Sequence, residues 1–162
     1  MSKIVLFASG SGSNVEHIIR YFEGSSSVQV AFVFTNKQEA KVLERCKSLG
    51  VPAAFFNKAA LNGSAFLEIL QCLDPDLIVL AGYLLKIPNE WVSAFSRRII
   101  NIHPALLPKY GGKGMYGMRV HEAVVQGQEK ESGISIHFVN EHYDQGAMIA
   151  QYKVPIEAKD TP

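Results

Sequence analysis

The sequence predicts an α/β fold: a mostly parallel, twisted sheet with helices on both of its faces. Short apolar runs of strand type alternate along the chain with amphipathic stretches of helical spacing. The run Leu77–Ala81 is apolar without alternation, which is typical of a parallel strand that is buried on both faces. The 162 residues, 48% of them hydrophobic, are enough to build one sizeable core.

Each expected element follows from its local pattern. Strands are expected where β-type apolar residues run together, and helices where apolar residues recur at spacings of three and four. The expected strands are Lys3–Ala8, Val28–Thr35, Ala53–Phe56, Leu77–Ala81, Arg98–Ile102, Ile134–Val139 and Met148–Ile156. The expected helices are Ser13–Phe22, Glu39–Leu49, Ala65–Leu73, Glu90–Phe95 with Pro88 at its start, and Val120–Gln126. The stretch Pro104–Gly117 is rich in Gly and Pro, and its length favours a functional loop.

Composition excludes several classes of protein. Sixteen basic and 15 acidic residues give a net charge of +1, whereas domains that grip nucleic acid through its phosphates are usually far more basic. The longest uncharged apolar run, Leu77–Leu85, has nine residues, and a membrane span needs about 20. The N-terminus lacks the apolar run of a secretory signal. We therefore expect a cytoplasmic protein with neither a nucleic-acid nor a membrane partner.

The chain shows neither a linker nor an internal repeat, so one domain is expected over residues 1–162. Thr161-Pro162 is a helix-start signal, which predicts that this domain lacks a further, C-terminal helix. Cys46 and Cys72 both fall in expected helices, where buried reduced thiols are the simplest interpretation. Their spacing fits no zinc motif, and no metal is expected.

The loop after the first strand, Ser9–Asn14, predicts an anion site. Gly10 and Gly12 allow a tight turn, and Ser13 with Glu16 has the spacing of a capping box that starts a helix at Ser13. The amides and the dipole at a helix N-terminus suit a phosphate. Neither the dinucleotide pattern nor the Walker pattern is present, which favours a single phosphate group. An ordinary Gly/Ser turn that caps a helix is the alternative.

A polar cluster is expected after the fifth strand. Asn101 and His103 stand at positions i and i+2 and therefore point to the same side. A histidine can transfer protons near neutral pH, and an asparagine amide can stabilise an oxyanion. Asp144, in a turn-like segment, could orient the His103 ring and stabilise its charged form. His137 is expected to pack behind the site. The alternatives are a structural histidine, a capping asparagine, and an aspartate that supports only its own turn.

These motifs, in this order, carry a resemblance over nearly the whole chain. They are Ser9–Asn14, Asp76–Tyr83, Asn101–Lys109, His137–Val139 and Asp144–Gly146. The chain resembles the phosphoribosylglycinamide formyltransferases (glycinamide ribonucleotide transformylases), a branch of the folate-dependent formyltransferase superfamily. The resemblance implies a Rossmann-like formyltransferase fold and a monomer or weak homodimer. It also implies transfer of a formyl group from 10-formyltetrahydrofolate to the amine of glycinamide ribonucleotide, in de novo purine biosynthesis.

The resemblance also implies which residues act. The catalytic residues would be Asn101, His103 and Asp144, with Asn101 and protonated His103 stabilising a tetrahedral intermediate. The substrate-binding residues would be Gly12, Ser13, Asn14 and Pro104, and those near the folate Leu84, Leu85, Lys86, Ile87, Asn101, Asn140, Glu141, His142 and Tyr143. A formyltetrahydrofolate hydrolase and a non-catalytic folate- or nucleotide-binding module remain alternatives. A transferase acting on initiator tRNA is disfavoured, because such an enzyme normally carries a basic extra domain.

Overall fold

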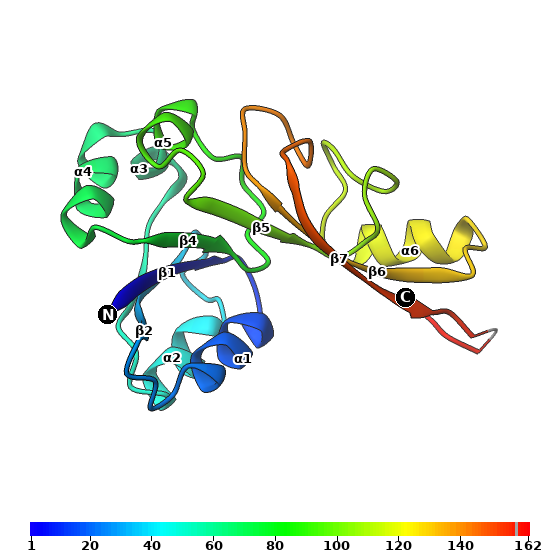
Figure 1. Ribbon diagram of the computed structural model, residues 1–162, viewed down its shortest axis with the longest axis horizontal. Helices are drawn as coiled ribbons and strands as arrows, with labels where there is room; N and C mark the ends of the chain where they lie inside the picture. Colours follow the sequence, from blue (N-terminus) through cyan, green and yellow to red (C-terminus); the bar gives the residue numbers. More distant parts are fainter. Residues whose placement is uncertain (158) are drawn as a thin grey trace. The chain divides into compact units, whose positions relative to one another are not determined.

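The computed structural model describes residues 1–157 and 159–162, which form two compact units, Met1–Ile99 and Ile100–Pro162 (Figure 1). Each unit has strands and helices of its own. The prediction of a single domain over residues 1–162 stays a prediction.

The first unit contains a parallel sheet. Its strands are β1 (Ser2–Ala8), β2 (Val28–Thr35), β3 (Ala53–Phe55) and β4 (Leu77–Leu80). They lie in the order β3-β2-β1-β4, and all three neighbouring pairs are parallel. The chain therefore builds outward from β1 to β3 and then returns to the other side of β1. In such sheets, ligands bind outside the carboxyl ends of the strands where this reversal occurs.

Helices cover both faces of this sheet, as predicted. They are α1 (Ser13–Tyr21), α2 (Val42–Ser48), α3 (Lys58–Leu61), α4 (Ser64–Leu73) and α5 (Asn89–Ala94). In Figure 1, α1 and α2 lie on one side of the strands, and α4 and α5 on the other. Phe7 is fully buried at the centre of an aromatic core, 5.3 Å from the Phe34 ring and 5.7 Å from the Trp91 ring, centroid to centroid. This apolar core fixes the strand ends from which the loops of the unit emerge.

The strands of the second unit are antiparallel, which the sequence pattern did not predict. Its strands are β5 (Ile99–His103, beginning at the last residue of the first unit), β6 (Glu131–Phe138) and β7 (Met148–Pro155). β6 pairs with β5 and β7, and both pairs are antiparallel. The helix α6 (Met118–Gln126) buries Val120 and Val124 in a small core with Ala105. Residues 104–117 contain neither helix nor strand, which confirms the predicted irregular loop.

Several local predictions need correction. The capping box is wrong: α1 begins at Ser13, but its N-cap is Gly12, with φ of 75° and no capping side chain. Glu16 instead pairs with Arg20 and Arg45, because these guanidinium groups offer stronger partners than a backbone amide. α2 begins at Val42 rather than at Glu39.

Two further differences concern the first unit. Helix α3 was not predicted, although Asn57 is its N-cap and the Asn57 Oδ1 accepts a hydrogen bond from Ala60 N at 2.8 Å. A four-residue helix is too short to show a period. Cys46 is buried, and burial raises the pKa of its thiol to about 11, but Cys72 is exposed because it lies on the outer face of α4.

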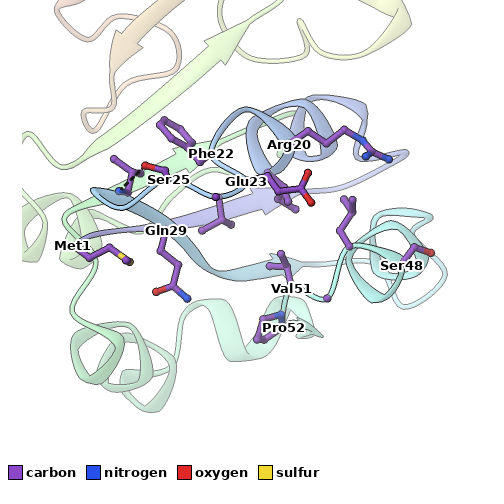
Figure 2. A pocket seen from close by; sticks show the side chains of 15 residues that line it. Met1, Arg20, Phe22, Glu23, Ser25, Gln29, Ser48, Val51 and Pro52 are labelled. Carbon is purple, nitrogen blue, oxygen red and sulfur yellow. Dashed lines mark hydrogen bonds between the residues drawn. The ribbon is translucent and has the colours of Figure 1, made fainter.

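A surface hollow of about 630 Å³ lies in the first unit, lined by residues such as Met1, Gln29, Val51 and Pro52 (Figure 2). These residues stand at the amino ends of β1 and β2 or just before β3. The hollow is therefore at the edge of the sheet opposite the carboxyl ends, where ligands of such sheets bind. Among the described residues, no helix combines the length and the apolar character needed to cross a bilayer.

Candidate active site

The anion loop, Ser9–Asn14, leaves the carboxyl end of β1 and leads directly into α1. The first helical hydrogen bond runs from Glu16 N to Gly12 O at 2.9 Å. The amides of Ser13, Asn14 and Val15 therefore precede the helical ladder and point outward from the helix start. The side chains of Ser13 and Asn14 are exposed. Free amides at a helix start are what a phosphate site needs, and the cap here is a glycine rather than the predicted serine. The phosphate site itself stays a prediction.

Two contacts from α2 hold the anion loop. Gly12 is buried against Val42, and a Cβ added to Gly12 would lie 2.5 Å from the Val42 Cγ2. The backbone therefore needs glycine here both for its positive φ and for space. Arg45 donates from Nε to the Ser11 carbonyl at 2.8 Å, and its guanidinium also pairs with Glu16. The hydrogen bonds to Arg20 and Arg45 hold the pKa of Glu16 below its ordinary value, so that this carboxylate stays charged.

The segment Leu84–Ile87 follows β4 in the same unit. Leu84 and Leu85 are partly exposed, Lys86 is exposed, and Ile87 is buried at 3% exposure. Tyr83, just before the segment, is 8% exposed, and its hydroxyl is a buried side-chain polar atom without a hydrogen-bond partner in the described part of the chain. The segment thus presents two leucines and a lysine outward from an apolar anchor.

In the second unit, side chains from β5, β6 and a turn converge on Asp144. This Asp144 cluster consists of Asn101, His103, His137 and Asp144. The Asp144 Oδ1 lies 3.6 Å from the His103 Nδ1, 3.6 Å from the His137 Nε2 and 3.2 Å from the Asn101 Nδ2. His103 is 3% exposed and His137 is 2% exposed. The structure therefore brings together the three residues predicted to be catalytic.

Asp144 is held as a carboxylate. Burial alone would raise its pKa, but the His137 side chain, the Gly112 amide that donates to it and the neighbouring His103 ring together bring the pKa below its ordinary value. The Gly112 N donates to Asp144 Oδ2 at 2.9 Å. Asp144 has a φ of 54°, in the left-handed region that few residues other than glycine adopt. An ionised carboxylate next to a histidine is the arrangement that orients an imidazole for proton transfer.

His103 has an acceptor on each side of its ring. The His103 Nε2 donates to the Tyr110 carbonyl at 2.8 Å, and Nδ1 faces Asp144. A doubly protonated His103 ring thus finds a partner at both nitrogens. Tyr110 reaches this position with a φ of 56°, and its hydroxyl is anchored 2.9 Å from Glu129.

Asn101 is oriented by His137. The His137 Nδ1 donates to the Phe138 carbonyl at 2.8 Å, which leaves Nε2 as the acceptor facing the Asn101 Nδ2 at 3.2 Å. The two amide hydrogens of Asn101 therefore face His137 and Asp144. A role as oxyanion donor requires that one of these hydrogens turns toward the substrate.

Sequence analysis assigned no role to Ser135 and Gln151, which hold the segment after His103. The Ser135 Oγ donates to the Ala105 carbonyl at 2.7 Å and accepts from Leu107 N at 2.9 Å. The Gln151 Nε2 donates to both Ser135 Oγ and the Leu107 carbonyl at 2.9 Å. The alternation of Ser135 and His137 on one face of β6 was the available signal, because two polar residues on a buried face need partners.

The remaining predicted residues lie beside this cluster in the second unit. Pro104, half-buried, follows His103 directly. The segment Asn140–Tyr143 precedes Asp144 in a turn closed by His142 N donating to Asn140 Oδ1 at 2.9 Å. Glu141, His142 and Tyr143 are exposed. In the described residues, no group of three or more His, Cys, Asp and Glu side chains could hold a metal ion.

Several proteins of known name are similar to this chain in sequence. A phosphoribosylglycinamide formyltransferase of Bacillus subtilis is 38% identical over 99% of this chain and 83% of its own length. The one from Escherichia coli is 36% identical over 98% of this chain and 75% of its own length. The chloroplastic enzyme of Arabidopsis thaliana is 44% identical over 99% of this chain. The chain spans 57% of that plant relative and 53% of the one from Vigna unguiculata.

Solved structures agree. A glycinamide ribonucleotide transformylase from Symbiobacterium toebii superposes with a TM-score of 0.88 at 34% identity, over 99% of this chain and 76% of that one. A phosphoribosylglycinamide formyltransferase from Anaplasma phagocytophilum gives 0.88 at 32% identity, over 99% and 75% of the two chains. These matches confirm the predicted fold class. The family model described as formyl transferase matches residues 2–162, and the chain therefore belongs to the formyl transferase family.

Proposed function

We propose that this protein transfers the formyl group of 10-formyltetrahydrofolate to the amine of glycinamide ribonucleotide. The observation that carries the proposal is the convergence of Asn101, His103 and Asp144 in a chain of the formyl transferase family. The names of its relatives, which are phosphoribosylglycinamide formyltransferases, support the choice of acceptor. This reaction is a step in the synthesis of purine nucleotides.

In the proposed reaction, the amine nitrogen of the ribonucleotide attacks the formyl carbon and forms a new C–N bond. The formyl oxygen takes up negative charge in a tetrahedral intermediate. Collapse of this intermediate breaks the bond between the carbon and N10 of the folate. One proton leaves the attacking amine and one arrives at N10, so protons balance.

The Asp144 cluster supplies the chemistry of this proposal. Protonated His103 and an N–H of Asn101 stabilise the oxyanion, and one such donor is typically worth about 2.7–4 kcal/mol in an oxyanion hole. His103 also relays the proton to N10, and general acid–base help typically contributes about 10²–10⁴-fold. Asp144 orients the His103 ring and stabilises the positive charge that it carries during the proton transfer. A donor on His103 becomes available to substrate when Nε2 exchanges its Tyr110 partner for the ligand.

The binding residues come from loops outside the cluster. Gly12, Ser13 and Asn14 would hold the ribonucleotide phosphate, because the amides of Ser13 and Asn14 precede the helical hydrogen-bond ladder at the start of α1. Leu84, Leu85, Lys86 and Ile87 would lie along the folate pterin, and Asn140–Tyr143 would close over it. Pro104 would approach the glycinamide. All of these assignments rest on the resemblance together with the loop positions.

A spectrophotometric assay of 10-formyltetrahydrofolate consumption, with and without glycinamide ribonucleotide, tests the proposal. A transferase consumes the folate only when the ribonucleotide is present. A hydrolase would use the same cluster with water as acceptor, and its rate would not respond to the ribonucleotide. A rate of folate consumption that does not change when the ribonucleotide is added would contradict the proposed function. So would the absence of folate consumption under both conditions.

A further inference from the structure

Ser9 is a fully buried polar residue at the point where β1 becomes the anion loop. Its amide donates to the Gly82 carbonyl at 3.0 Å. Its Oγ lies 2.6 Å from the Asn36 Oδ1 and 2.9 Å from the Leu84 N. The segments that follow β1, β2 and β4 therefore meet at one serine.

The roles of these hydrogen bonds are fixed by chemistry. The Leu84 amide is only a donor, so the Ser9 Oγ accepts from it. The single hydroxyl hydrogen of Ser9 is then donated to the Asn36 carbonyl oxygen. The Ser9 hydroxyl thus both donates and accepts, and its rotamer is defined from both sides. A buried side chain with this arrangement rigidifies the segments that it joins.

The two segments joined by Ser9 are those proposed to bind the two substrates. Gly12 follows Ser9 by three positions and opens α1, whereas Leu84 is the first residue of the segment Leu84–Ile87. The other bonds of the anion loop run to α2: Val42 N donates to Gly10 O, and Arg45 Nε donates to Ser11 O. These bonds fix the loop without reaching Leu84, so Ser9 has a separate task.

We propose that Ser9 is a positioning residue that holds the anion loop and the segment Leu84–Ile87 in a fixed position relative to each other. The inference deepens the proposed function and rests on it. Without the hydroxyl, the Leu84 amide loses its acceptor in a partly buried place, and the segment drifts from the loop. Binding of each substrate then includes the free energy of restoring the geometry.

The test is Ser9→Ala in the full chain. We expect the dissociation constants for glycinamide ribonucleotide and for 10-formyltetrahydrofolate, measured separately by calorimetry, each to rise about tenfold. The kcat at saturating substrates should stay within about threefold, because Ser9 touches no reacting atom. Ser93→Ala is the matched control: Ser93 is exposed on α5, and its loss should leave both constants unchanged.

A second variant keeps the test decisive if Ser9→Ala folds poorly. Asn36→Ala removes the acceptor of the Ser9 hydrogen but leaves the Leu84 bond, so both dissociation constants should rise together by about two- to fivefold. A lower melting temperature with both constants unchanged, or a change in only one constant, would overturn the inference. Wild-type protein that binds neither ligand would instead contradict the proposed function on which the inference rests.

Discussion

The anion loop and the Asp144 cluster differ in the groups that form them, which are backbone groups in the loop and side chains in the cluster. The anion loop consists of backbone: amides at the start of α1, a glycine at φ of 75° and a close contact with Val42. The Asp144 cluster consists of side chains from β5, β6 and a turn, joined by hydrogen bonds and charge. We therefore expect the loop to be more sensitive to added atoms than to changes of charge, and the cluster to be sensitive to a loss of charge even when the shape of the side chain is kept.

The largest expected effect comes from Asp144→Asn. The variant keeps the shape of the side chain but removes the charge that faces His103 and His137. We expect kcat to fall by about 10²–10⁴-fold, because His103 loses the partner of its charged form. Dissociation constants of both substrates should stay within about threefold. Binding lost in parallel with turnover would show that Asp144 serves binding rather than chemistry.

Gly12→Ala should break the loop instead. The new Cβ would lie 2.5 Å from the Val42 Cγ2, at a φ of 75° that alanine adopts only with strain. We expect a loss of unfolding free energy of about 2–5 kcal/mol, measured by urea denaturation. Ribonucleotide affinity should fall while folate affinity changes less. Gly24→Ala is the control, since its φ is 73° but a Cβ there meets nothing within 4 Å.

The stability of the fold should depend on pH through the Asp144 carboxylate. The folded pKa of Asp144 lies below its ordinary value, so its ionised form stabilises the fold. This contribution is fully present above the unfolded carboxyl pKa of about 4 and is lost as pH falls through the lower, folded pKa. Stability curves of the wild type and Asp144→Asn should therefore converge in acid. Curves that stay parallel from pH 7 to pH 2 would refute this role of the charge.

The smallest expected effect concerns Tyr83, next to the segment Leu84–Ile87. Burial raises the pKa of its phenol, and its hydroxyl has no hydrogen-bond partner in the described part of the chain. Tyr83→Phe removes an unsatisfied buried group and keeps the ring packed against Phe7. We expect thermal denaturation to show a gain of up to about 1 kcal/mol. A loss of stability would indicate that the hydroxyl has a partner in solution.

The sequence predicted most of the fold, and its errors have physical causes. Strands such as Val28–Thr35 were predicted to the residue, because runs of β-branched and aromatic residues end at polar turns. The antiparallel pairing of β5, β6 and β7 was missed, since strand direction depends on tertiary pairing and leaves no local pattern. The capping box failed because Arg20 and Arg45 compete for Glu16, and Arg45 comes from another helix.

The candidate site shows the same limit. Asn101 and His103 could be paired from their spacing on one strand, and the structure places Asp144 beside them. The task of Ser9 could not be predicted, because its partners lie 27 and 75 positions away along the chain. Residues that connect distant segments become visible only when the segments are placed in space.

The central claim is that the anion loop binds substrate while the Asp144 cluster carries the chemistry. An NMR titration of the ¹⁵N-labelled wild type and Asp144→Asn with glycinamide ribonucleotide tests it most directly. We expect the amide signals of Gly12, Ser13 and Asn14 to shift in both proteins, with matching affinity, although only the wild type turns over. Loop amides that do not respond to the ribonucleotide, or that respond only in the wild type, would contradict it.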